Sequence, residues 1–124
     1  MIPKRRKRER AGIRKEPRIR CPGHCAWIRG FPCAVHDERV CSGKIEAAHI
    51  RIGTDGGMGM KPSDCYVVPL CAHHHREQHQ VGEHNFWAYF TGYFDPHKIA
   101  AQLWARSPHR LKYERRIIER GERA

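Results

Sequence analysis

Cys71-Ala72-His73-His74-His75-Arg76-Glu77-Gln78-His79 is the stretch that we expect to decide the fold. On a helix, His75 and His79 lie four residues apart and project from one face, so both imidazoles can reach one ion. Cys71 and His74 lie three apart at the predicted helix start and are rotated away from that pair. The segment therefore predicts ligands for two different metal sites.

A tetrahedral structural zinc needs two more ligands besides Cys71 and His74. Cys33 and Cys41 flank a predicted knuckle-like turn and are one candidate pair, whereas Cys33 with His36 has a tighter, finger-like spacing and is the main rival. A third group, Cys21-Pro22-Gly23-His24-Cys25, is close enough in sequence to bind metal, but it lies beside a basic segment. Cys25 and Cys65 are also readily explained as free thiols.

Two strands are predicted upstream of this helix. The segment 44–51 (Lys-Ile-Glu-Ala-Ala-His-Ile-Arg) is expected to form the first, and 66–70 (Tyr-Val-Val-Pro-Leu) has the β-branched, apolar composition of the second. Between them, residues 53–59 contain four glycines and predict a connecting loop. A short helical turn is expected at 26–31. The fold class is therefore α+β.

The remainder of the chain is expected to be helical. Aromatic residues cluster at 86–90, and Asp95-Pro96 and Ser107-Pro108 each combine an N-cap residue with a proline at the first helical position. We expect a helix through Leu103-Trp104 and a basic terminal helix. The predicted organisation is a basic, disordered arm at 1–20, a core at 21–94, and a helical extension of the same domain at 95–124.

Charge and composition restrict the class of protein. The chain of 124 residues carries a formal net charge of +11, and +8 of it lies in the first 20 residues. Such a basic arm favours a polyanionic partner, with nucleic acid as the first candidate. No apolar run approaches a membrane span, and no secretory signal is recognisable. We therefore expect a cytoplasmic protein whose six cysteines are metal ligands or free thiols rather than disulfides.

Three segments together resemble the HNH endonucleases of phages and prophages: Glu46 to Arg51, the loop Gly53 to Asp64, and Val68 to His79. The resemblance covers roughly residues 24–95, and within that family the chain resembles uncharacterised prophage HNH proteins and RecA-dependent nucleases. It implies a ββα-metal core with a zinc-stabilised knuckle. The implied function is metal-dependent hydrolysis of DNA phosphodiester bonds, with structural Zn²⁺ and a catalytic Mg²⁺, Mn²⁺ or other divalent ion.

The resemblance also implies residue roles. His49 matches the general base, Asp64 is the nearest match to the central Asn, and His75 matches the final catalytic His. His75 and His79, with Asp64, would hold the catalytic ion. Ala48 departs from the family, whose members often have Asp or His there. The implied zinc ligands are Cys33, Cys41, Cys71 and His74, although the first pair is spaced more widely than the common CxxC, which keeps His36 as an alternative.

The residues themselves fit this chemistry. Phosphodiester hydrolysis needs an activated water and stabilisation of negative charge, and a neutral His on a strand can accept the proton. By strand alternation Arg51 should share the face of His49 and hold a phosphate oxygen. Lys61 and Arg76 are weaker candidates for phosphate binding, and a surface role explains them equally well. Glu46 falls on the opposite strand face, where a structural role is expected.

Two other functions are consistent with the sequence. A non-catalytic, zinc-stabilised nucleic-acid-binding module would keep the zinc ligands but would not need His49, His75 and His79 together. A phage accessory protein that binds a host recombination or replication protein would be compatible with the basic segment and the aromatic cluster. DNA is the expected partner in the leading hypothesis.

Overall fold

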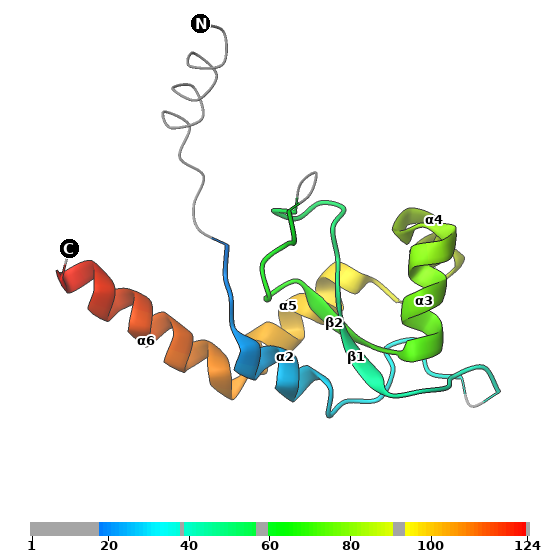
Figure 1. Ribbon diagram of the computed structural model, residues 1–124, viewed down its shortest axis with the longest axis horizontal. Helices are drawn as coiled ribbons and strands as arrows, with labels where there is room; N and C mark the ends of the chain where they lie inside the picture. The colour runs from blue at the N-terminus through cyan, green and yellow to red at the C-terminus, as the bar shows by residue number, and fades with distance from the viewer. Residues whose placement is uncertain (1–17, 38, 57–59, 91–93, 124) are drawn as a thin grey trace, which may run out of the picture.

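The computed structural model describes residues 18–37, 39–56, 60–90 and 94–123, and Figure 1 shows how they are arranged. The predicted mixed α+β class is confirmed. In chain order the described residues form α2 (Pro22–Ile28), β1 (Ile45–His49), β2 (Val67–Cys71), α3 (Ala72–Val81), α4 (Glu83–Tyr89), α5 (Pro96–Arg106) and α6 (Pro108–Arg123).

The two strands pair antiparallel and lead directly into α3. The register aligns Ile45 with Cys71 at one end and His49 with Val67 at the other. The strands are close to the predicted ranges, but β1 ends at His49 rather than at Arg51, and β2 begins and ends one residue later than expected. Helix α3 starts at once because the Cys71 side chain caps it by accepting a hydrogen bond from the backbone N–H of His74.

Other elements pack against each face of the two-stranded sheet, so the strands that carry the site residues are fixed by two groups of core residues. Side chains alternate between the faces of a strand. One face packs against α4 and the segment after α2, and its main core residues are Cys33, Val35, Ala48, Ile50, Val68, Leu70, Phe86 and Trp87. The other face packs against α2 and α5 through Cys25, Ile28, Val67 and Leu103.

The helices that follow the sheet fall where the sequence predicts them. A buried hydrogen bond of 2.8 Å from Trp87 Nε1 to Gln78 Oε1 ties α4 to α3. Asp95 caps α5 as expected, because its side chain accepts from the backbone N–H groups of His97 and Lys98. Helix α6 contacts α2 and α5 and then extends away from the sheet (Figure 1). Among the described residues, every helix is too short or too polar to cross a bilayer.

Residues 18–20, which we assigned to the disordered arm, are instead bound to the segment before β2. The backbone of Ile19 donates to Ser63 Oγ and accepts from the N–H of Asp64, both at 2.8 Å. Arg20 donates to the carbonyl oxygens of Lys61 and Pro62. The rest of the predicted arm, residues 1–17, and the loop positions 57–59 lie outside the described residues.

Candidate metal centres and a histidine–aspartate pair

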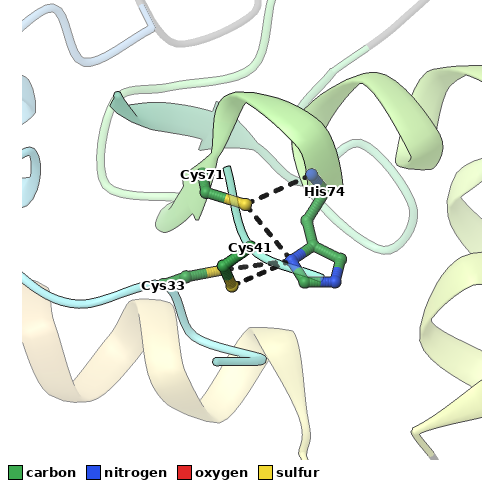
Figure 2. Close-up of side chains that lie close together, drawn as sticks. All are labelled: Cys33, Cys41, Cys71 and His74. Carbon is green, nitrogen blue, oxygen red and sulfur yellow. Dashed lines mark hydrogen bonds between the residues drawn. The ribbon is translucent and has the colours of Figure 1, made fainter. Parts of the chain in front are cut away.

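Four predicted zinc ligands converge at the start of α3, as Figure 2 shows. Their ligand atoms all lie within 4.8 Å of one another. His74 Nδ1 is 3.4 Å from Cys33 Sγ, 3.5 Å from Cys41 Sγ and 3.3 Å from Cys71 Sγ. The four-ligand cluster (Cys33, Cys41, Cys71 and His74) is therefore close enough to hold a metal ion, and the prediction that these residues lie together is confirmed.

The distances from the His74 nitrogen to the three sulfurs match those around a tetrahedral zinc. With Zn–S bonds of about 2.3 Å and a Zn–N bond of about 2.0 Å, tetrahedral angles place the nitrogen about 3.5 Å from each sulfur. The three observed N···S distances of 3.3 to 3.5 Å are close to that value. Three sulfurs and one imidazole are also a donor set typical of structural zinc.

Without a metal ion, the thiols of the four-ligand cluster differ in how readily they ionise. Burial raises the pKa of the Cys33 thiol to about 12, so without a positive charge nearby this thiol stays protonated at neutral pH. Burial also opposes ionisation of Cys71, but hydrogen bonds from the backbone N–H groups of His74 and Ser42 lower its pKa overall. A dication would complete the deprotonation, since a metal ion ionises the thiols that coordinate it.

The structure brings Cys41, and not its rival His36, into the cluster. His36 is exposed. Cys41 is turned inward because the segment from Asp37 curls around it: the backbone N–H of Asp37 donates to Cys41 Sγ, and the N–H of Cys41 donates back to the carbonyl of Asp37. The same loop then reaches α3, where Ala72 N donates to the carbonyl of Lys44.

A second group of histidines lies on the exposed side of α3. His75 Nε2 and His79 Nε2 are 3.2 Å apart, so the two nitrogens face each other as the helical spacing predicts. The other ring nitrogen of His75, Nδ1, is 2.8 Å from Glu46 Oε1 on β1. Two imidazoles whose Nε2 atoms meet at one point have the donor chemistry to hold a divalent ion.

Asp64 contacts His49 rather than the histidines of α3. His49 Nε2 lies 2.9 Å from Asp64 Oδ1, and Asp64 Oδ2 accepts from the backbone N–H of Cys21 at 2.7 Å. Burial opposes ionisation of Asp64, but these hydrogen bonds lower its pKa overall. Burial also lowers the pKa of His49. The His49–Asp64 pair therefore consists of a neutral imidazole and a carboxylate at neutral pH.

The sheet separates these two groups. Glu46 and His49 are three residues apart on β1, so their side chains point to opposite faces. Glu46 reaches His75 on its face, whereas His49 aligns with Val67, which packs toward α2 and α5. Among the described residues, Asp64 belongs to no cluster of three or more ligand atoms. The structure thus brings His75 and His79 together but does not bring Asp64 to them.

The three predicted phosphate-binding residues, Arg51, Lys61 and Arg76, are all exposed. Strand alternation does not determine the direction of the Arg51 side chain, because β1 ends two residues before it. The backbone N–H groups of Arg51 and Ile52 donate to the Glu83 carboxylate. Arg20, which the sequence did not single out, lies 3.8 Å from Asp64. The positive charges of Arg20 and Lys61 both oppose protonation of His49, so both side chains lie near the His49–Asp64 pair.

Glu46 is the site residue whose role the sequence pattern predicts least well. It was expected to have only a structural role, yet its carboxylate contacts a predicted metal ligand. A signal was present: residues 46, 48 and 50 share one face of the predicted strand, and the helix after the second strand has to pack on one face of the hairpin. The carboxylate could therefore have been placed near α3.

Comparisons with known proteins give a family but no activity. Residues 12–90 match the family described as "Protein of unknown function (DUF968)". A relative from Escherichia coli (strain K12), "Uncharacterized protein YdfU", is 41% identical over 54 residues, which make up 43% of this chain. The match spans only 14% of the length of that relative. No solved structure matches the chain.

Proposed function

Since the chain belongs to the DUF968 family, which is described as of unknown function, we propose from its own site that it is a divalent-metal-dependent endonuclease of the HNH type that hydrolyses DNA. The observation that carries the proposal is that one unit, β1–β2–α3, supplies a held neutral histidine and a facing histidine pair, and its β2–α3 junction supplies two members of the four-ligand cluster. This order and these residues are those that the HNH resemblance implies. Phage or prophage origin stays a prediction from that resemblance.

The four-ligand cluster is proposed to hold a structural Zn²⁺. It joins the segment after α2 to the junction of β2 and α3, and α3 carries His75 and His79. A core this small gains much of its stability from such a metal, because binding free energy is also folding free energy. The zinc would therefore fix where α3 starts and how it lies on the sheet.

His49 is proposed to be the general base. With the imidazole neutral and Asp64 ionised, the Nε2–H of His49 donates to Asp64 Oδ1, and Nδ1 keeps the lone pair that accepts a proton from water. Asp64 is then a positioning residue that selects this tautomer. Its second oxygen is already bonded to the backbone of Cys21, so in this proposal it is not a metal ligand.

His75 and His79 are proposed to bind the catalytic divalent ion through their facing Nε2 atoms. When bound, such an ion supplies charge stabilisation to a phosphate oxygen and to the leaving 3′ oxygen. Arg20, Lys61 and Arg76 are exposed basic groups that would orient the DNA backbone by contacting phosphates. Phosphate contacts of this kind supply affinity without reading sequence.

A nicking assay tests the proposal. Zinc-loaded protein is incubated with supercoiled plasmid in Mg²⁺ or Mn²⁺, and linear duplex, single-stranded and branched DNA are compared in parallel. The proposal expects cleavage that requires the divalent ion and stops when EDTA removes it. Absence of cleavage on every DNA form, by protein that has both its zinc and bound Mn²⁺, would contradict the proposal.

One observation favours a second candidate function, a non-catalytic zinc-stabilised module that binds nucleic acid. His49 and the His75–Glu46 contact lie on opposite faces of the sheet, so one phosphodiester would have to reach both histidines around the edge of the sheet. A binding module has no such requirement. It predicts salt-dependent DNA binding that is unchanged in a His49→Ala variant, and no nicking under any condition. A phage accessory protein that binds a host recombination or replication factor would instead retain that factor on purification.

A further inference from the structure

Glu46 and the two exposed histidines of α3 form a chain of contacts. Glu46 Oε1 is 2.8 Å from His75 Nδ1, and His75 Nε2 is 3.2 Å from His79 Nε2. Glu46 stands on β1, whereas the histidines stand on the helix that follows β2. The contact therefore crosses from the first strand to α3, and it aligns three side chains from two elements.

These contacts determine where the protons sit. A neutral imidazole carries hydrogen on one nitrogen and a lone pair on the other. The Glu46 carboxylate can only accept, so it selects the form of His75 in which Nδ1–H donates to Oε1. His75 Nε2 then holds a lone pair that faces His79 Nε2 at 3.2 Å. In the metal-free chain the Nε2–H of His79 donates to it. For a divalent ion to bind between the two Nε2 atoms, His79 would carry its hydrogen on Nδ1 instead, which frees its Nε2 lone pair.

We propose that Glu46 is a positioning residue that holds His75 in the Nδ1–H tautomer and thereby prepares a divalent-cation site between His75 and His79. This inference rests on the metal pair of the proposed function. Glu46 is not itself the ligand, because its oxygen bonds the ring nitrogen that points away from His79. A carboxylate behind a coordinating histidine also raises the basicity of the ligand and fixes the ring orientation.

The same helix supplies a matched control. His73 Nε2 lies 3.4 Å from Glu77 Oε2, and both side chains are about as exposed as Glu46, at 36% and 41% against 49%. This pair has the same residue types and lies on the same helix, but it is not part of the His75–His79 contact. Removing the Glu77 carboxylate changes the surface charge by the same amount without touching His75.

The test measures Mn²⁺ binding to the full-length, zinc-loaded chain by electron paramagnetic resonance of free Mn²⁺. Mn²⁺ is a suitable probe because it is not selected by thiolate ligands and so leaves the thiolate cluster to zinc. Glu46→Ala is expected to weaken Mn²⁺ binding by about 10- to 100-fold, the usual effect of losing such a partner. Glu46→Gln should lose less, since its amide oxygen still accepts from Nδ1–H. Glu77→Ala should bind as the unaltered chain does.

A second readout separates positioning from a general structural role. Long-range ¹H–¹⁵N correlation on the zinc-loaded chain without Mn²⁺ should show His75 protonated at Nδ1, and Glu46→Ala should shift it toward the Nε2–H form. Unchanged Mn²⁺ affinity and an unchanged tautomer in Glu46→Ala would overturn the proposal. So would His75→Ala that binds Mn²⁺ normally.

The proposed nuclease function can fail independently. If the unaltered chain bound Mn²⁺ with the expected dependence on Glu46 but cleaved no DNA, the nuclease would be refuted and the role of Glu46 would stand. Zinc content measured on every variant confirms that the four-ligand cluster is still filled, so a change in Mn²⁺ binding reports on the exposed site.

Discussion

Replacing Cys71 with serine isolates the metal-binding role of its sulfur. Cys71 ends β2, caps α3 by accepting from His74 N, and lies in the four-ligand cluster. Serine is among the preferred N-cap residues, so Cys71→Ser keeps the helix cap and the approximate volume. What it removes is one thiolate of the three that would bind zinc.

The expected loss is comparable to the whole stability of the domain. Structural zinc binding supplies about 10–16 kcal/mol of apparent free energy in zinc-finger peptides at neutral pH. A domain of ordinary size has a total unfolding free energy of only about 5–15 kcal/mol. Cys71→Ser is therefore expected to lose the zinc and to be unfolded or molten at 25 °C, with low soluble yield.

The assay combines zinc content per chain by elemental analysis with thermal unfolding followed by circular dichroism, with and without EDTA. Cys65→Ser is the matched control, because Cys65 is a half-buried free thiol outside the cluster. It should keep one zinc per chain and a melting temperature close to that of the unaltered protein. Cys71→Ser with full zinc content and an unchanged melting temperature would refute the assignment of the ligands.

Three further predictions concern the basic N-terminal segment, the backbone and a buried histidine. Deleting residues 1–17 should reduce the dependence of DNA binding on salt: the slope of log K for DNA binding against log salt should become shallower by about 0.9 for each phosphate that the segment neutralises. The zinc content should stay the same. An unchanged slope in a binding titration would mean that the segment does not bind DNA. Gly43 has φ +83°, and a Cβ there would lie 2.6 Å from Ala72 Cβ. Gly43→Ala should therefore lower the free energy of unfolding, measured in urea, by about 1–3 kcal/mol. Gly121 lies in an open position of α6, and Gly121→Ala should raise the free energy of unfolding by up to about 1 kcal/mol. Burial lowers the pKa of His24 to about 4. Below about pH 6.5 the unfolded imidazole binds a proton that the folded one does not, so the contribution of His24 to stability should fall by about 2 kcal/mol between pH 7 and pH 5. The unfolding free energy of His24→Leu should lack this part of the pH dependence.

The elements around α3 could be predicted from the sequence because their signals are local. Helical spacing alone places Cys71 beside His74 and His75 beside His79, and the structure brings both pairs together. Asp95 and Pro96 mark the start of α5 for the same reason. Such features depend on a few neighbouring residues, so tertiary packing does not have to be known.

The choice of Cys41 over His36 and the partner of Asp64 could not be predicted, because both depend on how distant segments meet. Cys41 turns inward through hydrogen bonds to Asp37 in an irregular loop. Asp64 reaches His49 because the antiparallel register aligns His49 with Val67 and brings the residues before β2 alongside. A resemblance to HNH proteins suggested that Asp64 was a ligand, but the sequence carries no local signal for this register.

The central claim, that one histidine moves a proton and two others bind an ion, is tested most directly by metal rescue of nicking. His49→Ala and His79→Ala are assayed on supercoiled plasmid over a wide range of Mn²⁺, with zinc content and DNA affinity checked in both. His49→Ala is expected to lose about 10²–10⁴-fold in rate at every Mn²⁺ concentration. His79→Ala should recover activity as Mn²⁺ rises, because its defect is weak ion binding. Equal rescue of both variants, or full activity in His49→Ala, would contradict the account.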